Sequence, residues 1–174
     1  IQKAAELIDM RQHKGEHPRM GATDVCPLIP IAGITMEQAV EYAQQLADRV
    51  GNELHIPVYL YEHAATKPER TNLADIRAGE YEALPEKLKK AEWKPDSGSA
   101  EFNAKSGATV IGARDFLIAY NVNLNTTSSR RANAVAFDVR EQGRLVSSEE
   151  VKGEKVRVPG TLKFVKGIGW YIEE

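Results

Sequence analysis

The sequence predicts an α/β (α+β) fold, in which β-sheets are covered by helices. Apolar stretches with strand character, such as 56–61, alternate along the chain with segments of helical periodicity, such as 35–53. Each predicted helix has one apolar face, which must pack on a sheet or on another helix. The chain has 174 residues, of which 42% are hydrophobic and 28% charged, and this suits one globular domain or two small ones.

The first elements are predicted from capping signals and prolines. Residues 1–11 place apolar side chains at helical spacing and predict a helix. Residues 25–31 are apolar but contain two prolines, which cannot donate to a ladder, so we expect a short or edge strand. The clearest helix covers 35–53, because Thr35 and Gln38 form a capping box at its start.

The middle of the chain gives weaker signals and one long loop. The helical pattern of 62–84 is broken at Gly79, and a further short helix is expected over 85–90 with a proline at its first position. The stretch WKPDSGSAEFNAKSGATV, 93–110, is rich in Gly, Ser, Asn and Pro. Such a long connection usually has a function of its own, and it leads into a strand at 108–112.

The last third predicts a strand, a helix, a polar insert and a final strand. Alternate residues of 116–124 share one apolar face, which predicts a strong strand. Ser128 or Ser129 caps a helix, 144–160 is a polar insert, and 162–174 returns to strand character. The inward residues of that helix, and the glycine just past its end, would be Ala132, Val135, Ala136, Val139 and Gly143.

Composition and charge narrow the function classes. The net charge of −2 and the pI near 6.2, with no basic stripe, argue against a nucleic-acid partner. The single cysteine, Cys26, cannot form an internal disulfide, and no apolar run approaches the roughly 18 residues of a membrane span, so we expect a cytoplasmic protein without a membrane partner. The first residue is not Met, and we expect the chain to begin within a longer protein.

The segment HKGEHPRMG, 13–21, contains H-x-x-E-H, the inverted zinc-peptidase signature. That signature requires both histidines on one helix face, whereas Gly15 and Pro18 oppose a helix here. A third ligand would have to be Asp24, Cys26 or a distant residue, with no spacing rule to support it. We therefore expect no metal.

The same segment suits a reacting group held by a fixed backbone. Gly15 and Gly21 bracket a loop that presents His17, Arg19 and Asp24. The alternative interpretations are that His17 only bonds a neighbouring carbonyl, and that Asp24 only caps a turn rather than orienting His17.

Several blocks of the sequence follow one another along nearly the whole chain: HKGEHPRMGATDVCPLIPI, IPVYLYEHAA, DIRAGEYEALPEKL, GATVIGARDFLIAYNVNL and VKGIGWYIEE. Together and in this order, these blocks resemble the formiminotransferase domain family. Only the insert 144–160 has no counterpart that we identify.

The resemblance implies an enzyme that transfers the formimino group of N-formimino-L-glutamate to N5 of tetrahydrofolate in histidine degradation. It implies two small subdomains, each a β-sheet with helices on its outer face, and a ligand cleft between them. These would be 1–115, lacking the family's first strand and helix, and 116–174, the start of the second; a change in composition between Gly112 and Phe116 agrees with this border. The resemblance also suggests a homodimer.

The resemblance assigns His17 as the catalytic general acid/base, since imidazole titrates near neutrality. The folate-binding loop maps onto Gly98, Ser99, Ala100, Glu101, Phe102, Asn103, Ala104, Lys105, Ser106 and Gly107.

Within these blocks, Arg19 and Arg77, with Lys105 of the folate loop, are the cations that could meet the carboxylates of glutamate and folate, and Asp24 is a further candidate. Arg77 could equally pair with Glu80 or Glu82. Two other functions compete with the transferase: a folate-binding module without turnover, and a metal hydrolase built on H-x-x-E-H.

Overall fold

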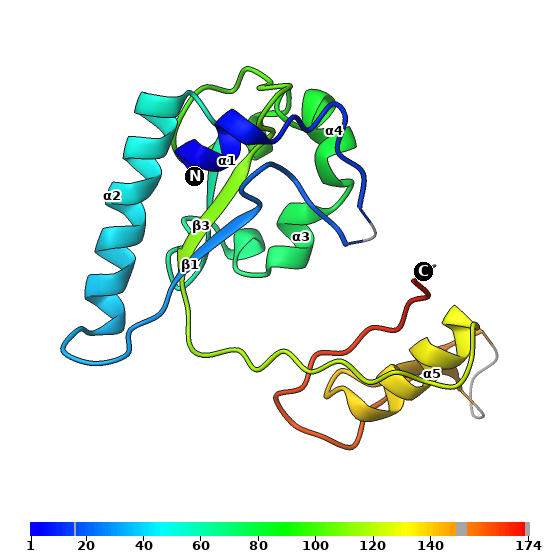
Figure 1. Cartoon of the computed structure of the whole chain (residues 1–174). Helices are drawn as coiled ribbons and strands as arrows, with labels where there is room; N and C mark the ends of the chain where they lie inside the picture. The colour runs from blue at the N-terminus through cyan, green and yellow to red at the C-terminus, as the bar shows by residue number, and fades with distance from the viewer. Residues whose placement is uncertain (16, 149–152, 173–174) are drawn as a thin grey trace. The chain divides into compact units, whose positions relative to one another are not determined.

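The computed structural model describes residues 1–15, 17–148 and 153–172 (Figure 1). The chain divides into two compact units, Ile1–Ile118 and Ala119–Glu174. Helices occur together with a parallel sheet in the first unit and with an antiparallel sheet in the second, which confirms the α/β class. In the part of the chain that the structure describes, no helix has the length and apolar character needed to cross a membrane.

The first unit is built on a parallel sheet of three strands in the order β1-β3-β2. The strands are β1 (Val25–Leu28), β2 (Val58–Glu62) and β3 (Thr109–Ala113). The prediction of an edge strand is confirmed, because β1 pairs with β3 alone and contains Pro27. The segments that precede β1 and β3 therefore meet at the amino-terminal edge of the sheet, and these segments contain His17 and the predicted folate loop.

The helices of the first unit are α1 (Gln2–Leu7), α2 (Met36–Leu54), α3 (Leu73–Arg77) and α4 (Glu80–Lys87), with 3-10 turns at Pro68–Arg70 and Ala91–Trp93. The capping box is confirmed, since the Thr35 side chain accepts from the Gln38 backbone N–H at 3.3 Å. The helix predicted over 85–90 is wrong: α4 already begins at Glu80, and Pro85 lies inside it. Gly79 has a left-handed backbone and precedes the first residue of α4, so the helix begins before the predicted start. Pro85 inside the helix removes one backbone hydrogen bond.

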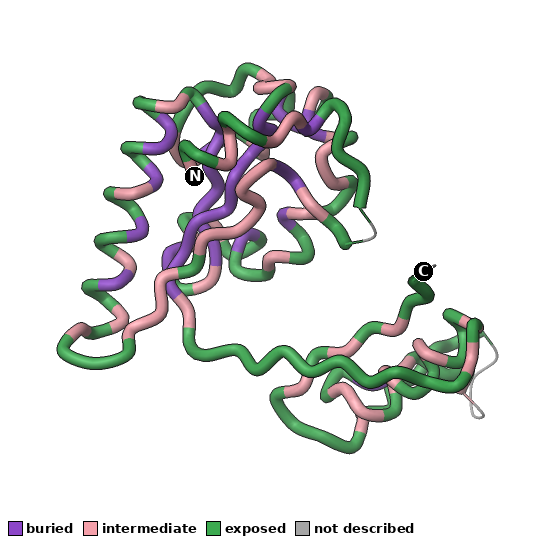
Figure 2. Tube along the Cα trace, viewed as in Figure 1, coloured by how far each residue is buried: buried purple, intermediate pink, exposed green. Residues whose placement is uncertain are grey.

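Helices cover both faces of the sheet (Figures 1 and 2). Successive strand residues point to opposite faces, so each strand contributes to two separate apolar clusters. The cluster under α2 contains Ala43, Ala47, Val50, Val58, Leu60 and Ile111. The cluster under α3 and α4 contains Met20, Tyr59, Tyr61, Ile76, Leu84, Ala108 and Val110. Because Met20 and Ala108 belong to this second cluster, the apolar core itself fixes the ends of the two segments that precede β1 and β3.

The outer edge of β2 is covered by a buried ion pair. The Asp96 carboxylate accepts from the Leu60 backbone N–H at 2.9 Å and from Arg70 Nη1 at 2.6 Å. Only 1% of Arg70 is exposed, and its guanidinium also lies 5.1 Å from the centre of the Tyr59 ring. Covering the edge in this way removes a row of open backbone donors and acceptors.

Lys87 is a second buried cation, under the turn between α3 and α4. Its ammonium donates to the carbonyls of Ile76 at 2.5 Å and Ala78 at 3.1 Å, and lies 3.9 Å from the centre of the Trp93 ring. Burial, with the nearby Arg70 and Lys90 cations, lowers the pKa of Lys87 to about 8.

This pKa predicts a pH-dependent stability. The folded state releases the Lys87 proton near pH 8, and the unfolded chain keeps it until its ordinary pKa of 10.5, so the Lys87 contribution to the free energy of unfolding rises with pH above about 8. We expect the free energy of unfolding of the wild type, minus that of Lys87→Met, to increase between pH 8 and 10. Urea titrations at several pH values measure this difference. Burial raises the pKa of Cys26, which has the opposite effect on the pH dependence, but this effect is the same in both proteins and cancels in the difference. A difference independent of pH would contradict the prediction.

The second unit contains α5 (Ser129–Val139) and a hairpin of β4 (Arg144–Ser147) with β5 (Lys155–Val158). The Ser128 side chain accepts from the Arg131 N–H at 3.4 Å, which confirms the predicted cap. The insert 144–160 thus folds as an antiparallel pair, although 149–152 lie outside the described residues.

Two predicted strands of this region are wrong. Residues 116–124 form no strand, and Ile118 and Tyr120 are 92% and 85% exposed. An alternating pattern gives a strand only where a neighbouring strand pairs with it, and none of the described strands does so here. The described part of 162–174, up to residue 172, also has no strand.

The final segment packs on α5 instead of on a sheet. The Gly169 carbonyl accepts from Asn133 Nδ2 at 2.5 Å, and the Gly169 N–H donates to Asn133 Oδ1 at 3.0 Å. A Cβ on Gly169 would lie 2.3 Å from the carbonyl carbon of Ala132, so only glycine permits this approach. The expectation that Val135 points inward is wrong, because this residue is 48% exposed. Gly143 lies beyond the end of α5 at Val139, in the turn that leads into β4.

Candidate functional site

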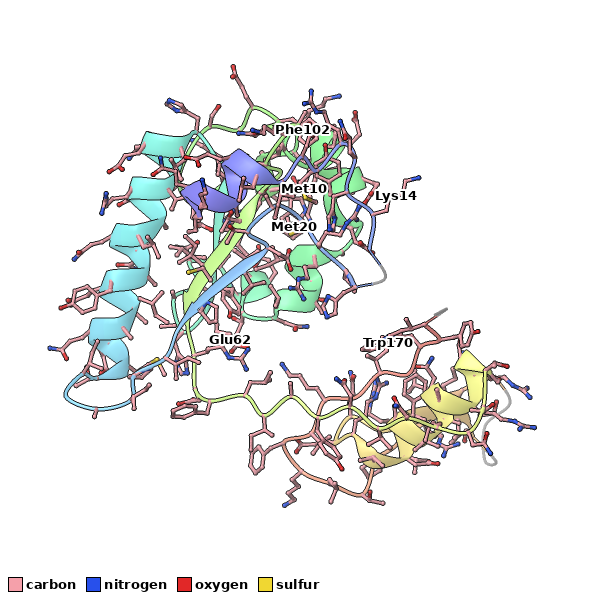
Figure 3. The ribbon with its side chains drawn as sticks, viewed as in Figure 1. Met10, Lys14, Met20, Glu62, Phe102 and Trp170 are labelled. Atoms are coloured by element: carbon pink, nitrogen blue, oxygen red, sulfur yellow. The ribbon has the colours of Figure 1, made fainter. Side chains whose placement is uncertain are left out.

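The segment that carries His17 is an irregular loop anchored at both ends. Met10 and Met20 are 2% and 0% exposed, and the loop between them lies on the surface. Figure 3 shows both methionines on the inner side of the loop and Lys14 on its outer side. The Met10 N–H donates to the carbonyl of Lys105 at 2.9 Å, and the Met20 carbonyl accepts from the Ala108 N–H at 3.0 Å. The predicted folate loop and Ala108, the residue directly after it, therefore hold the two ends of the His17 loop.

His17 is exposed, and its ring contacts the backbone of the next residue. Its Nδ1 lies 2.9 Å from the carbonyl oxygen of Pro18. A carbonyl only accepts, so this contact requires the proton on Nδ1, and the neutral ring then carries its lone pair on Nε2. The bond to a neighbouring carbonyl that the sequence analysis considered is therefore present, and it favours the tautomer with the proton on Nδ1.

His17 lines a pocket of about 360 Å³. Its lining residues are Ile8, Met10, His13, Gly15, His17, Pro18, Arg19, Gly21, Ala22 and Asp24. Three of the residues predicted from the sequence, His17, Arg19 and Asp24, thus line one pocket. The sheet positions this pocket at the start of β1, because Asp24 immediately precedes Val25.

The predicted folate loop is held by backbone hydrogen bonds rather than by regular structure. In its second half, the Ser106 carbonyl accepts from the Ala22 N–H at 2.9 Å, and the Ala104 carbonyl accepts from the Tyr81 hydroxyl at 2.6 Å. Gly107 forms a bridge with Gly21. These bonds attach the loop directly to the lining of the His17 pocket and to α4.

Gly98 and Asn103 of this loop meet the end of α2 and the residues after it. Asn103 Nδ2 donates to the His55 carbonyl at 3.2 Å, and Asn103 Oδ1 accepts from the Ser106 N–H at 3.0 Å. A Cβ on Gly98 would lie 2.6 Å from the Ile56 carbonyl oxygen, and the φ of Gly98 is +83°, so this position requires glycine. The side chains of Ser99 and Glu101 remain exposed to solvent.

Arg19 is held by two carboxylates of α4. Its Nη1 lies 3.0 Å from Glu80 Oε2, and its Nη1 and Nη2 meet the two oxygens of Glu82 at 2.9 and 2.7 Å. Hydrogen bonding to Glu82, and then to Glu80, raises the pKa of Arg19 above its ordinary value. The pairing of Arg77 with Glu80 or Glu82 that the sequence left open is wrong, because Arg19 occupies these partners.

Arg77 pairs instead with Asp24. The Asp24 Oδ2 accepts from Arg77 Nη2, and its Oδ1 accepts from the Met20 N–H at 2.7 Å. Asp24 therefore caps the turn that ends the His17 loop and fixes it to α3. Of the four residues proposed outside the folate loop, the structure gathers His17, Arg19 and Asp24 at the pocket, with Arg77 behind Asp24.

Sequence reasoning did not find the role of α4 in this site. Glu80, Tyr81 and Glu82 hold Arg19 and Ala104, and they are separated from Arg19 by about sixty residues, a spacing that no local pattern encodes. One local signal was present: E-Y-E directly follows Gly79, where acidic side chains suit the first turn of a helix.

The histidines of H-x-x-E-H do not share a helix. His13 and His17 both lie in irregular backbone beyond the end of α1, and Glu16 lies outside the described residues. Within 1–15, 17–148 and 153–172, no three His, Cys, Asp or Glu side chains are grouped as a metal site requires.

Comparison with known proteins covers both units. The family model "Formiminotransferase domain, N-terminal subdomain" matches residues 1–114, and "Formiminotransferase domain" matches 119–174.

Curated relatives match the chain nearly from end to end. Formimidoyltransferase-cyclodeaminase of Rattus norvegicus is 55% identical over 98% of this chain and 30% of its own length. Glutamate formimidoyltransferase of Streptococcus pyogenes serotype M1 is 44% identical over 100% of this chain and 53% of its own, and that of Thermoplasma acidophilum is 45% identical over 100% and 52%. The chain thus spans between about a third and a half of the length of these relatives. With family models matched over both of its units, the chain belongs to the formiminotransferase family.

Proposed function

We propose that the protein transfers the formimino group from N-formimino-L-glutamate to N5 of tetrahydrofolate, with His17 as the general acid/base. The observation that carries this proposal is the position of His17: an exposed imidazole that lines a pocket in a chain that belongs to the formiminotransferase family. The relatives named glutamate formimidoyltransferase support the same reaction.

The chemistry needs one group that both accepts and donates a proton. N5 of tetrahydrofolate attacks the formimino carbon and forms a C–N bond, and Nε2 of His17 takes the N5 proton. As the bond from this carbon to the glutamate nitrogen breaks, the His17 imidazolium gives that proton to the departing nitrogen, which leaves as an amine. The products are 5-formimino-tetrahydrofolate and glutamate, and the imidazole returns to its starting state.

We propose that residues 98–107 bind folate. Their support is the resemblance together with their attachment to the His17 pocket through Ser106 and Gly107. A loop fixed in this way can hold folate close to His17 without ordering itself on binding, which would otherwise weaken affinity.

For the other candidates, the contacts suggest different roles. Asp24 and Arg77 bond each other, and we propose that they position the end of the His17 loop. Arg19 faces both carboxylates of α4 and the pocket, so it remains a candidate for substrate binding. We also keep the proposals of two subdomains, 1–115 and 116–174, and of a cytoplasmic homodimer acting in histidine degradation, all of which rest on the resemblance.

A transfer assay on the intact protein tests the proposal. With tetrahydrofolate and formiminoglutamate, we expect spectrophotometric formation of 5-formimino-tetrahydrofolate and release of one glutamate per turnover. Folate binding without any transfer at saturating substrate would show that the protein is a folate-binding module and not an enzyme. Failure of both binding and transfer would refute the proposal altogether.

A further inference from the structure

A second pocket, of about 410 Å³, adjoins the His17 pocket. It is lined by Lys14, Gly15, Arg19, Gly79, Glu80 and Glu82. Gly15 and Arg19 line both pockets, so a molecule in the second one would lie beside the first. All of its charged side chains come from the His17 loop and from α4.

The charges in this pocket are arranged as a planar fork on a carboxylate. The Nη1 and Nη2 of Arg19 bond both oxygens of Glu82, at 2.9 and 2.7 Å. The Arg19 side chain is only 12% exposed, whereas that of Glu82 is 63% exposed. The hydrogen bonds from Arg19 also lower the pKa of Glu82, so it is a carboxylate at neutral pH. Glu82 is therefore an accessible anion that now binds the planar N–C–N group of the Arg19 guanidinium.

Glu80 keeps Arg19 in place independently of Glu82. Its Oε2 lies 3.0 Å from Arg19 Nη1 and 3.4 Å from the Arg19 backbone N. Glu80 has a left-handed backbone, with φ +56°, and follows Gly79 at φ +81°. If Glu82 exchanged its partner, Arg19 would still be charge-balanced and fixed.

The substrate of the proposed function has the matching chemistry. A formimino group on an amine is an amidine, which is protonated in neutral water and presents the same planar N–C–N fork as a guanidinium. The rest of formiminoglutamate carries two carboxylates. The molecule therefore carries one cationic group and two anionic groups, complementary to Glu82 on one side and to Arg19 and Lys14 on the other.

We propose that this pocket binds formiminoglutamate, with Glu82 receiving the formamidinium and with Arg19 and the exposed Lys14 receiving the carboxylates. The inference rests on the proposed function. Binding would exchange one bidentate ion pair for two pairs of the same kind, so no buried charge is left without a partner at any stage. It would also make Glu82 the residue that distinguishes a formimino group from a neutral formyl group.

The variant Glu82→Gln tests this assignment by binding alone. Isothermal titration calorimetry on the intact protein, without tetrahydrofolate so that no turnover occurs, measures the dissociation constants of formiminoglutamate and of N-formyl-L-glutamate. The two compounds share both carboxylates and differ only in the transferred group, which is a cationic formamidinium in one and a neutral formamide in the other. We expect Glu82→Gln to weaken formiminoglutamate binding by roughly ten-fold or more, and formylglutamate binding by less than about two-fold.

Glu86→Gln is the matched control. Glu86 lies on the same helix, is 76% exposed and pairs with Lys89 outside the pocket, so its substitution should change neither constant. Far-UV circular dichroism confirms that both variants fold. If Glu82→Gln bound both compounds more weakly by the same factor, or bound both as tightly as the wild type, the inference would be overturned. Transfer activity of the wild type would in that case still support the proposed function. A wild type that binds neither compound and transfers nothing would remove both.

Discussion

His17→Ala is expected to lower the rate of formimino transfer by roughly 10²- to 10⁴-fold, the range that a positioned general acid/base contributes. The His17 side chain is exposed, so its removal should disturb the fold little. Folate affinity should stay within a few-fold of wild type. Steady-state rates and a fluorescence titration with folate measure the two quantities.

His13→Ala is the matched control for this variant. His13 lines the same pocket, is also exposed, and lies four residues earlier on the same loop. We expect it to keep transfer within a few-fold of wild type. If both variants lost activity equally, or if His13→Ala lost more, the assignment of His17 as the acid/base would be wrong.

Gly107→Ala is expected to destabilise the first unit by roughly 2–5 kcal/mol and to weaken folate binding together with transfer. A Cβ here would lie 2.1 Å from the Met20 carbonyl oxygen and 2.8 Å from the Gly21 Cα, where the folate loop meets the His17 loop. Forcing these backbones apart costs about 1–3 kcal/mol. The positive φ of +70° adds about 1–2 kcal/mol for a residue with a Cβ.

Gly33→Ala separates these two costs. Gly33 has nearly the same φ, +71°, but a Cβ there would meet nothing within 4 Å. We expect it to lose only about 1–2 kcal/mol, with folate affinity unchanged. Urea unfolding followed by circular dichroism gives both free energies. Equal destabilisation by the two substitutions would show that the close contact between the loops does not contribute.

The parts of the fold that the sequence predicted are those that local interactions determine. The capping box of α2 needs only Thr35 and Gln38, and the edge position of β1 follows from a proline that lacks a donor. The cap of α5 at Ser128 is equally local. In the site, the fixed loop around His17 followed from its glycines and proline.

The failures arise where distant residues decide the outcome. The alternation in 116–124 has the period of a strand, but a strand also needs a paired neighbour, and the described strands do not supply one. The pairs Arg19–Glu82 and Arg77–Asp24 join residues 63 and 53 positions apart. Opposite charges are common on any chain, so their choice of partner depends on the packing of α3 and α4 against the sheet. Local spacing carries no information about that packing.

Rescue of His17→Ala by imidazole tests the central claim most directly. Because the side chain is exposed at a pocket, added imidazole can reach the position that it leaves. We predict that the transfer rate of the variant rises with the concentration of neutral imidazole, while the wild-type rate does not change. Transfer by His17→Ala at the wild-type rate without imidazole would contradict the account.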